Sequence, residues 1–108
     1  MTFSLFMSLT KGMRLTVAGE LDVNTVERLE PTLAMVVRRH PVHIEVELSD
    51  LRMIDSTGVG QLVGFCKRLR AVGCRPVIVG LRDQPLAVFR LLRLDRMLAD
   101  AEIELPCT

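Results

Sequence analysis

The sequence contains no tryptophan and no tyrosine, and its four aromatic residues are all phenylalanine. It therefore lacks the aromatic platforms on which single-stranded nucleic acid bases usually stack. The sequence also lacks an excess of charge of either sign, since 14 basic and 13 acidic side chains give a formal net charge of +1. This balance does not favour nucleic acid or an anionic membrane surface as the main partner.

Cysteine is scarce and odd in number. Cys66, Cys74 and Cys107 have neither the paired spacing of a disulfide framework nor that of a zinc site, so we interpret them as free thiols in a reducing compartment. No apolar run approaches the length of about 20 residues that crosses a bilayer. The apolar stretch at residues 2–7 is short and lacks the basic leader of a signal peptide. We expect a cytoplasmic protein without membrane insertion, metal or cofactor.

The chain has 108 residues, of which 49% are hydrophobic, and this suffices for one domain over residues 1–108 with its own core. Alternating and helical apolar patterns follow one another along it. They predict an α/β fold, with a mixed sheet of four to five strands and helices packed against it. The expected strands cover residues 3–9, 13–18, 44–48, 76–80 and 101–105, and the expected helices cover 23–40, 57–72 and 85–94.

Two of these elements carry more specific predictions. Asp22 or Asn24 is expected to cap the first helix, and Pro31 predicts that this helix begins late, kinks or is split. The run from Pro76 to Gly80 is entirely apolar in its middle, which predicts a strand covered on both faces.

The main polar cluster is the segment Ile54-Asp55-Ser56-Thr57-Gly58-Val59-Gly60, between a predicted strand and a predicted helix. Asp55 is expected to cap that helix, which places Ser56 at the helix N-terminus. Free backbone N–H groups and the helix dipole favour negative charge there, so a phosphate on Ser56 would be stabilised. Thr57 is the second candidate acceptor. By itself the local pattern favours ordinary helix capping over a modification site.

Glycine is unusually frequent in the second predicted helix. Gly58, Gly60 and Gly64 each cost up to about 1 kcal/mol relative to alanine. Gly60 and Gly64 lie one turn apart, away from the apolar stripe. They either allow a partner's backbone to come close or let the helix pack tightly on the sheet.

Two motifs together resemble a known family. Gly19-Glu20-Leu21-Asp22 precedes the first helix, and Asp55-Ser56-Thr57-Gly58-Val59-Gly60 precedes the second, about 35 residues further on. With both motifs at strand-to-helix junctions, the chain resembles a STAS domain of the bacterial anti-sigma factor antagonist type, from about Ser4 to Glu104.

The resemblance implies a partner switch rather than an enzyme. Antagonists of this type bind an anti-sigma factor that is also a serine kinase, and the sigma factor is thereby released. The kinase phosphorylates the serine after the motif aspartate, here Ser56, which ends binding, and a serine phosphatase resets the switch. The partner-binding residues implied here are Asp22, Asp55, Ser56, Thr57, Gly58, Gly60, Gln61 and Gly64.

Other interpretations stay open at this point. STAS domains also serve as scaffolds in stress-signalling assemblies or as accessory subunits of lipid-transport ATPases. Nucleotide binding is poorly supported, because the loop lacks the Gly-x-x-x-x-Gly-Lys spacing. His40 and His43 are interpreted as surface loop residues. The third helix carries arginines among too many apolar residues for one buried face, which suggests solvated edges, partner contact or weak homodimerisation of a monomer.

Overall fold

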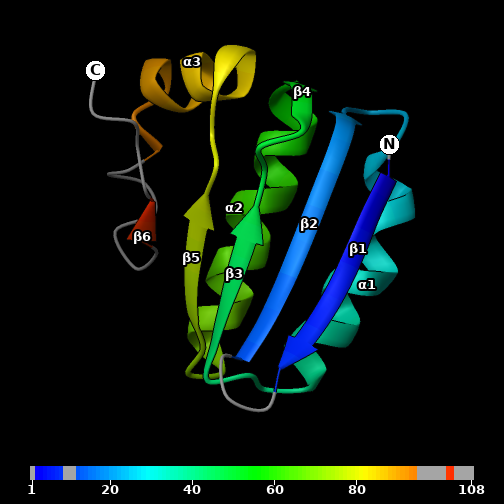
Figure 1. The fold of residues 1–108 in the computed structure, drawn as a ribbon, viewed down its shortest axis with the longest axis vertical. Coiled ribbons are helices and arrows are strands. Elements are labelled where there is room, and N and C mark those ends of the chain that lie inside the picture. The colour runs from blue at the N-terminus through cyan, green and yellow to red at the C-terminus, as the bar shows by residue number, and fades with distance from the viewer. Residues whose placement is uncertain (1, 9–11, 95–101, 104–108) are drawn as a thin grey trace.

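The computed structural model describes residues 2–8, 12–94 and 102–103. Helices α1 and α2 cover one face of a mixed sheet, and α3 lies across one end of it (Figure 1). This confirms the predicted α/β fold. The strands are β1 (Thr2–Ser8), β2 (Gly12–Leu21), β3 (His43–Glu47), β4 (Leu51–Ile54), β5 (Arg75–Val79) and β6 (Glu102–Ile103), and the helices are α1 (Val26–Arg38), α2 (Ser56–Ala71) and α3 (Asp83–Leu91).

The strands follow the order β1-β2-β3-β5-β6, and β4 pairs with β2 apart from this path. Strand β1 is antiparallel to β2, while all other pairs are parallel. The first two predicted strands are therefore present as an antiparallel pair, and residues 9–11 between them lie outside the described residues. Strand β4 was not predicted from the sequence.

Two different strands pair with β2 on the same side, one along its first half and one along its end (Figure 1). Residues 13–16 pair with β3, and residues 19–21 pair with β4. The ladder shifts register at Gly19, whose φ of 91° is accessible to glycine without strain and whose N–H donates to the Asp50 carbonyl at 2.9 Å. The prediction that the strand ends at Ala18 was therefore wrong, because the chain changes partner there and continues to Leu21.

The core lies between the sheet and the two covering helices. Alternate residues of β2 and β3 point into it, and each fully buried aliphatic side chain contributes about 1.5–3 kcal/mol relative to exposure. Helix α2 buries Val59, Leu62, Phe65, Cys66 and Leu69 against the sheet. The largest fully buried side chains are Phe65, Leu15, Leu21, Leu29, Leu33, Ile44, Leu48, Leu51, Ile54, Leu62, Leu69 and Ile78.

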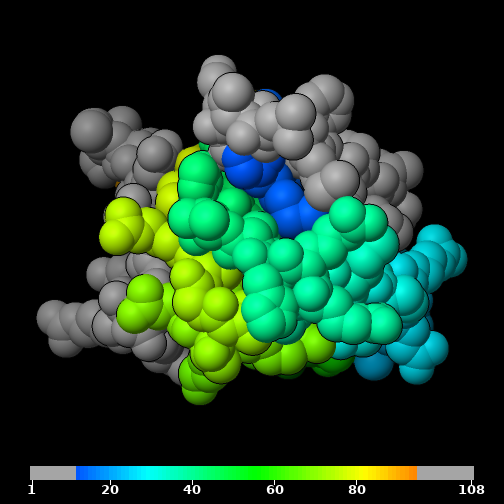
Figure 2. Space-filling model, turned by 90° about the horizontal axis from the view of Figure 1, so that it is seen from below, coloured from blue at the N-terminus to red at the C-terminus, as the bar shows by residue number. Residues whose placement is uncertain are grey.

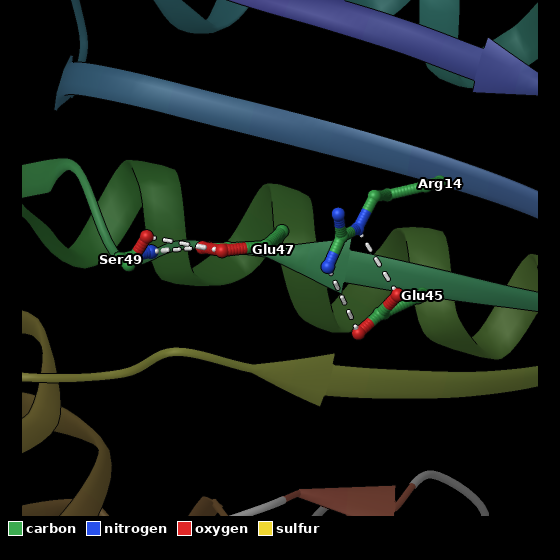
Figure 3. Close-up of polar contacts among 4 residues, drawn as sticks. All are labelled: Arg14, Glu45, Glu47 and Ser49. Atoms are coloured by element: carbon green, nitrogen blue, oxygen red, sulfur yellow. Dashed lines mark hydrogen bonds and ion pairs between the residues drawn. The ribbon is translucent and has the colours of Figure 1, made fainter.

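The opposite face of the sheet carries polar contacts, and none of the described helices covers it (Figures 1 and 3). Arg14 Nε pairs with Glu45 Oε2 at 3.1 Å across β2 and β3, and Glu47 accepts hydrogen bonds from Ser49. Val77 and Val79 are paired in register with the two glutamates and are half-buried. The prediction that this strand is covered on both faces was wrong, since α1 and α2 lie on one face only.

Helix α1 starts at Val26, three residues later than predicted. Its N-cap is Thr25, so the expectation that Asp22 or Asn24 caps it was wrong. The Thr25 hydroxyl donates to the Glu20 carbonyl at 2.9 Å and accepts from the Asp22 N–H at 2.9 Å, which ties the helix start to the end of β2. The helix begins before Pro31 and runs through this proline, so it neither starts at Pro31 nor is split there.

Helices α2 and α3 lie close to their predicted positions. Gly73, with a φ of 81°, follows the end of α2, a position that favours glycine. Helix α3 begins at Asp83 rather than Pro85 and ends at Leu91. Leu91 and Leu92 are 81% and 46% exposed, so part of its apolar surface faces solvent. No helix in the described ranges is both long and apolar enough to cross a membrane.

Candidate functional site at the start of helix α2

The two sequence motifs meet at one end of the sheet. Strands β2 and β4 are parallel and pair Leu21 with Ile54 at their carboxyl ends. The chain leaves both strands at the same edge, so Asp22 and Asp55 begin two neighbouring loops. The Asp55 N–H donates to the Leu21 carbonyl at 3.2 Å and extends the ladder into the loops. Segments more than thirty residues apart thus form one site.

Asp55 holds these two loops together with its carboxylate. Oδ1 accepts the Gly58 N–H at 2.9 Å, which is the predicted capping bond of α2. Oδ2 accepts the Val23 N–H at 3.1 Å, from the loop that follows β2. The hydrogen bond from the Gly58 N–H is the largest cause that lowers the pKa of Asp55 below its ordinary value; desolvation opposes it, and the Val23 N–H lowers the pKa further. The carboxylate is therefore ionised at neutral pH.

Ser56 and Thr57 are the first two residues of α2, and both are exposed. The first turn contains no acidic residue, and the last turn carries Arg68 and Arg70. Ser56 therefore lies where the helix dipole favours added negative charge, beside the carboxylate of Asp55. The hydroxyl can be reached from solvent without unfolding any element.

The three glycines of this helix differ in their surroundings. Gly58 is buried, and a Cβ there would collide with the Leu21 carbonyl and lie 2.8 Å from Cγ1 of Ile54. A Cβ on Gly60 or Gly64 would meet nothing within 4 Å. Tight packing on the sheet therefore explains Gly58, whereas Gly60 and Gly64 leave an open strip beside Ser56.

Gln61 and Asp22 face their own chain. The Gln61 side-chain amide donates to the Val26 carbonyl at 2.7 Å and to Glu30 at 3.3 Å, which joins α2 to α1. Glu30 also pairs with Arg68 at 2.9 Å. Asp22 is half-buried, and its Oδ1 accepts the Asn24 N–H at 2.9 Å. Gln61 and Asp22 therefore stabilise the helices and the loop that carry the site, while Ser56, Thr57 and Gly60 lie on its surface.

Several residues at the site were not predicted from the sequence. Val23 is 63% exposed and Met53 is 45% exposed, one in each of the two segments that Asp55 joins. Arg52 forms a loose ion pair with Glu20 at 3.8 Å. A single exposed apolar residue carries no local signal, and β4 itself was missed, so only the fold brings these side chains to the site.

The remaining polar candidates lie elsewhere. His40 and His43 are exposed at the other end of the sheet, onto which Figure 2 looks. His43 lines a groove of about 690 Å³ there, together with Val42, Arg70, Gly73, Cys74, Arg75 and Val77. Within residues 2–8, 12–94 and 102–103, no three His, Cys, Asp or Glu residues are grouped to hold a metal ion.

The cysteines of the described ranges are buried free thiols. Burial, with a smaller contribution from Cys74, raises the pKa of Cys66 to about 12, and burial also raises the pKa of Cys74. A thiol with a raised pKa is a poor nucleophile at neutral pH. Cys107 lies outside the described residues.

Comparison with known proteins gives consistent results. The family model of the STAS domain matches residues 10–105. An anti-sigma-B factor antagonist of Staphylococcus aureus is 36% identical over 78 residues, which cover 72% of each chain. One of Listeria monocytogenes is 28% identical over 88 residues, covering 82% of this chain and 77% of that protein. The solved structure of the anti-sigma factor antagonist SpoIIAA in its unphosphorylated form superposes with a TM-score of 0.72 at 21% identity, over 97% of this chain and 89% of that one.

Proposed function

The chain belongs to the STAS domain family, and on this premise we propose that it is an anti-sigma factor antagonist that acts by partner switching. Its unphosphorylated form binds an anti-sigma factor with serine kinase activity and thereby releases the sigma factor. Phosphorylation of Ser56 ends this binding, and a serine phosphatase restores it. The names of the relatives from Staphylococcus aureus and Listeria monocytogenes support the antagonist role.

The observation that carries the proposal is the position of Ser56. It is the first residue of α2, exposed, and flanked by an aspartate whose carboxylate fixes both loops of the site. A small neutral side chain there lets a partner surface close over the helix start. A phosphate would add about −1.5 to −2 charges and three acceptor oxygens at the same point. The helix N-terminus tolerates this charge, whereas an apolar or acidic partner surface does not.

The surface beside Ser56 supports close docking. Gly60 and Gly64 present backbone without side chains over open space, and Val23 and Met53 are exposed apolar residues at the same end of the molecule. Exposed apolar groups contribute binding energy when a partner covers them. We propose that the partner contacts Ser56, Thr57 and the glycine strip, while Asp22, Asp55, Gly58 and Gln61 keep the loops and helix in place.

The test measures phosphorylation and binding together. The protein is isolated from its native cells and analysed by intact-mass and peptide mass spectrometry, and its affinity for the ATP-binding anti-sigma factor of the same organism is measured by calorimetry. A phosphate on Ser56, and weaker binding by the phosphorylated form, are expected. A phosphate on Thr57 would correct the site. Equal affinity of both forms would overturn the switch and favour the role of a scaffold or transporter subunit.

A further inference from the structure

Strand β4 is short, and among the strands that the structure describes it pairs with β2 alone. Its last residue, Ile54, is 1% exposed and directly precedes Asp55 and Ser56. The N–H and C=O of a single strand residue point to the same side of the strand. The next residue, Asp55, donates its N–H to β2, so both backbone groups of Ile54 point away from β2, towards the open edge.

Gln84 occupies this edge. Its Oε1 accepts the Ile54 N–H at 2.9 Å, and its Nε2 donates to the Ile54 carbonyl at 2.9 Å. The side-chain amide thus pairs with Ile54 as the peptide group of a neighbouring strand would. Gln84 lies in the first turn of α3, 30 residues further along the chain, and α3 packs against β4.

The start of α3 is anchored at a second point. Nε of Arg82 donates to the Ser49 carbonyl at 2.7 Å, and its guanidinium lies 3.6 Å from the Asp50 carboxylate. Ser49 and Asp50 form the turn before β4, whereas Ile54 ends that strand. Arg82 therefore fixes α3 to the entrance of β4 and Gln84 fixes it to the exit, immediately before the candidate phosphorylation site.

We propose that Gln84 is a positioning residue of the Ser56 site, which couples the position of α3 to the geometry of the Ser56 loop through the backbone of Ile54. The assignment of Ser56 as the modified residue rests on the proposed function, whereas the coupling itself is a property of the isolated chain. A partner that displaces α3 therefore changes the backbone geometry of the loop that carries Ser56. Conversely, a charge on Ser56 changes how firmly α3 is held, because coupling between two sites is reciprocal.

The test uses Gln84→Met, which keeps the length and apolar stem of the side chain and removes both hydrogen bonds. Backbone amide exchange is followed by NMR on the isolated protein. The Ile54 amide is expected to exchange about tenfold faster, as for the loss of about one hydrogen bond. The amides of Val23 and Gly58, which donate to Asp55, are expected to lose protection, and the pKa of Asp55 to rise towards its ordinary value of 3.8.

Arg52→Ala is the matched control, since Arg52 lies on the same strand with its side chain 76% exposed and should leave these amides unchanged. Unchanged protection of Ile54 in Gln84→Met would overturn the pairing. Faster exchange at Ile54 alone, with Val23, Gly58 and Asp55 as in the wild type, would overturn the coupling.

A second measurement does not depend on that variant folding. In Ser56→Glu, exchange of the Gln84 side-chain amide and of the Ile54 amide is expected to differ from the wild type, and identical rates would overturn the proposal. Neither experiment contains a partner protein. Loss of the coupling is therefore distinguishable from failure of the antagonist role, which shows only in binding to the anti-sigma factor.

Discussion

The carboxylate of Asp55 accepts a hydrogen bond of 3.1 Å from the backbone N–H of Val23, which lies 32 residues earlier in the chain. The same carboxylate caps α2 through Gly58. One side chain therefore fixes the loop after β2 and the loop after β4 to each other. The site depends on the charge of Asp55 and on the absence of a side chain at Gly58. Both can be tested separately from partner binding.

Stability should depend on pH through Asp55. Its pKa is lowered in the folded state, so on acidification the unfolded chain takes up this proton first. The contribution of Asp55 is complete above the ordinary value of 3.8 and is lost as the pH falls through the lower folded-state pKa. Asp55→Asn keeps an acceptor for Gly58 but presents an N–H to Val23, and should lose this pH dependence. Urea unfolding at pH 6 and at pH 3 measures it, and equal pH dependence of both proteins would contradict the prediction.

A negative charge at position 56 should weaken binding without changing the fold, whereas a neutral substitution should not. Ser56→Ala is expected to bind the anti-sigma factor as the wild type does and to take up no phosphate. Ser56→Glu should bind roughly 5- to 150-fold more weakly, in the range of typical coupling free energies. Calorimetric titration measures the affinity, and thermal unfolding controls for the fold. Phosphate incorporation by Ser56→Ala would show that another residue is the acceptor.

Gly58 and Gly60 should respond in opposite ways to alanine. Gly58→Ala places a methyl group against the Leu21 backbone and should cost about 1–3 kcal/mol of stability, as overpacked core sites do. Gly60→Ala meets open space and should increase stability by up to about 1 kcal/mol through helix propensity.

Binding separates these two glycines further. If a partner backbone approaches the strip, Gly60→Ala weakens the affinity for the anti-sigma factor although the protein is more stable. Denaturant midpoints and calorimetry on the same preparations measure both effects. Unchanged affinity in both Gly60→Ala and Gly64→Ala would remove the strip from the interface.

The buried thiols should be inert in the folded protein. With a pKa of about 12, only about one Cys66 side chain in ten thousand is a thiolate at pH 8. In a Cys107→Ser background, a disulfide reagent should react with Cys66 and Cys74 only as fast as the protein unfolds, and promptly in urea. Rapid reaction of Cys66 without denaturant, identified by peptide mass spectrometry, would show that α2 opens locally.

The elements with strong periodicity were predictable from the sequence, and so was the position of Ser56. Helix α2 was found to within one residue at each end because its apolar stripe, the capping Asp55 and the terminating Gly73 all agree. Strand β4 was missed since Arg52 and Met53 are both exposed, which breaks the alternation expected of a strand. The strand forms because the last residues of β2, at and after Gly19, offer backbone groups with which it pairs.

Other features depend on contacts that no local pattern encodes. Asp22, Asn24 and Thr25 are all of residue types that favour the N-cap. Thr25 takes this position without a side-chain capping bond, and its hydroxyl instead donates to the Glu20 carbonyl at the end of β2. Gln84 was unpredictable for a similar reason, since its partner lies 30 residues away and is a backbone group. Sequence patterns indicate which residue types can serve, and tertiary contacts decide which one does.

The pairing of β4 with β2 has a consequence for how such proteins diverge. The ladder that presents Ser56 is formed by backbone groups, so its geometry does not require particular side chains at the exposed positions of β4. Arg52 and Met53 are therefore free to change during evolution at little cost to folding. Duplicated copies of such a gene can acquire different partners through these two positions while each retains the same presentation of Ser56.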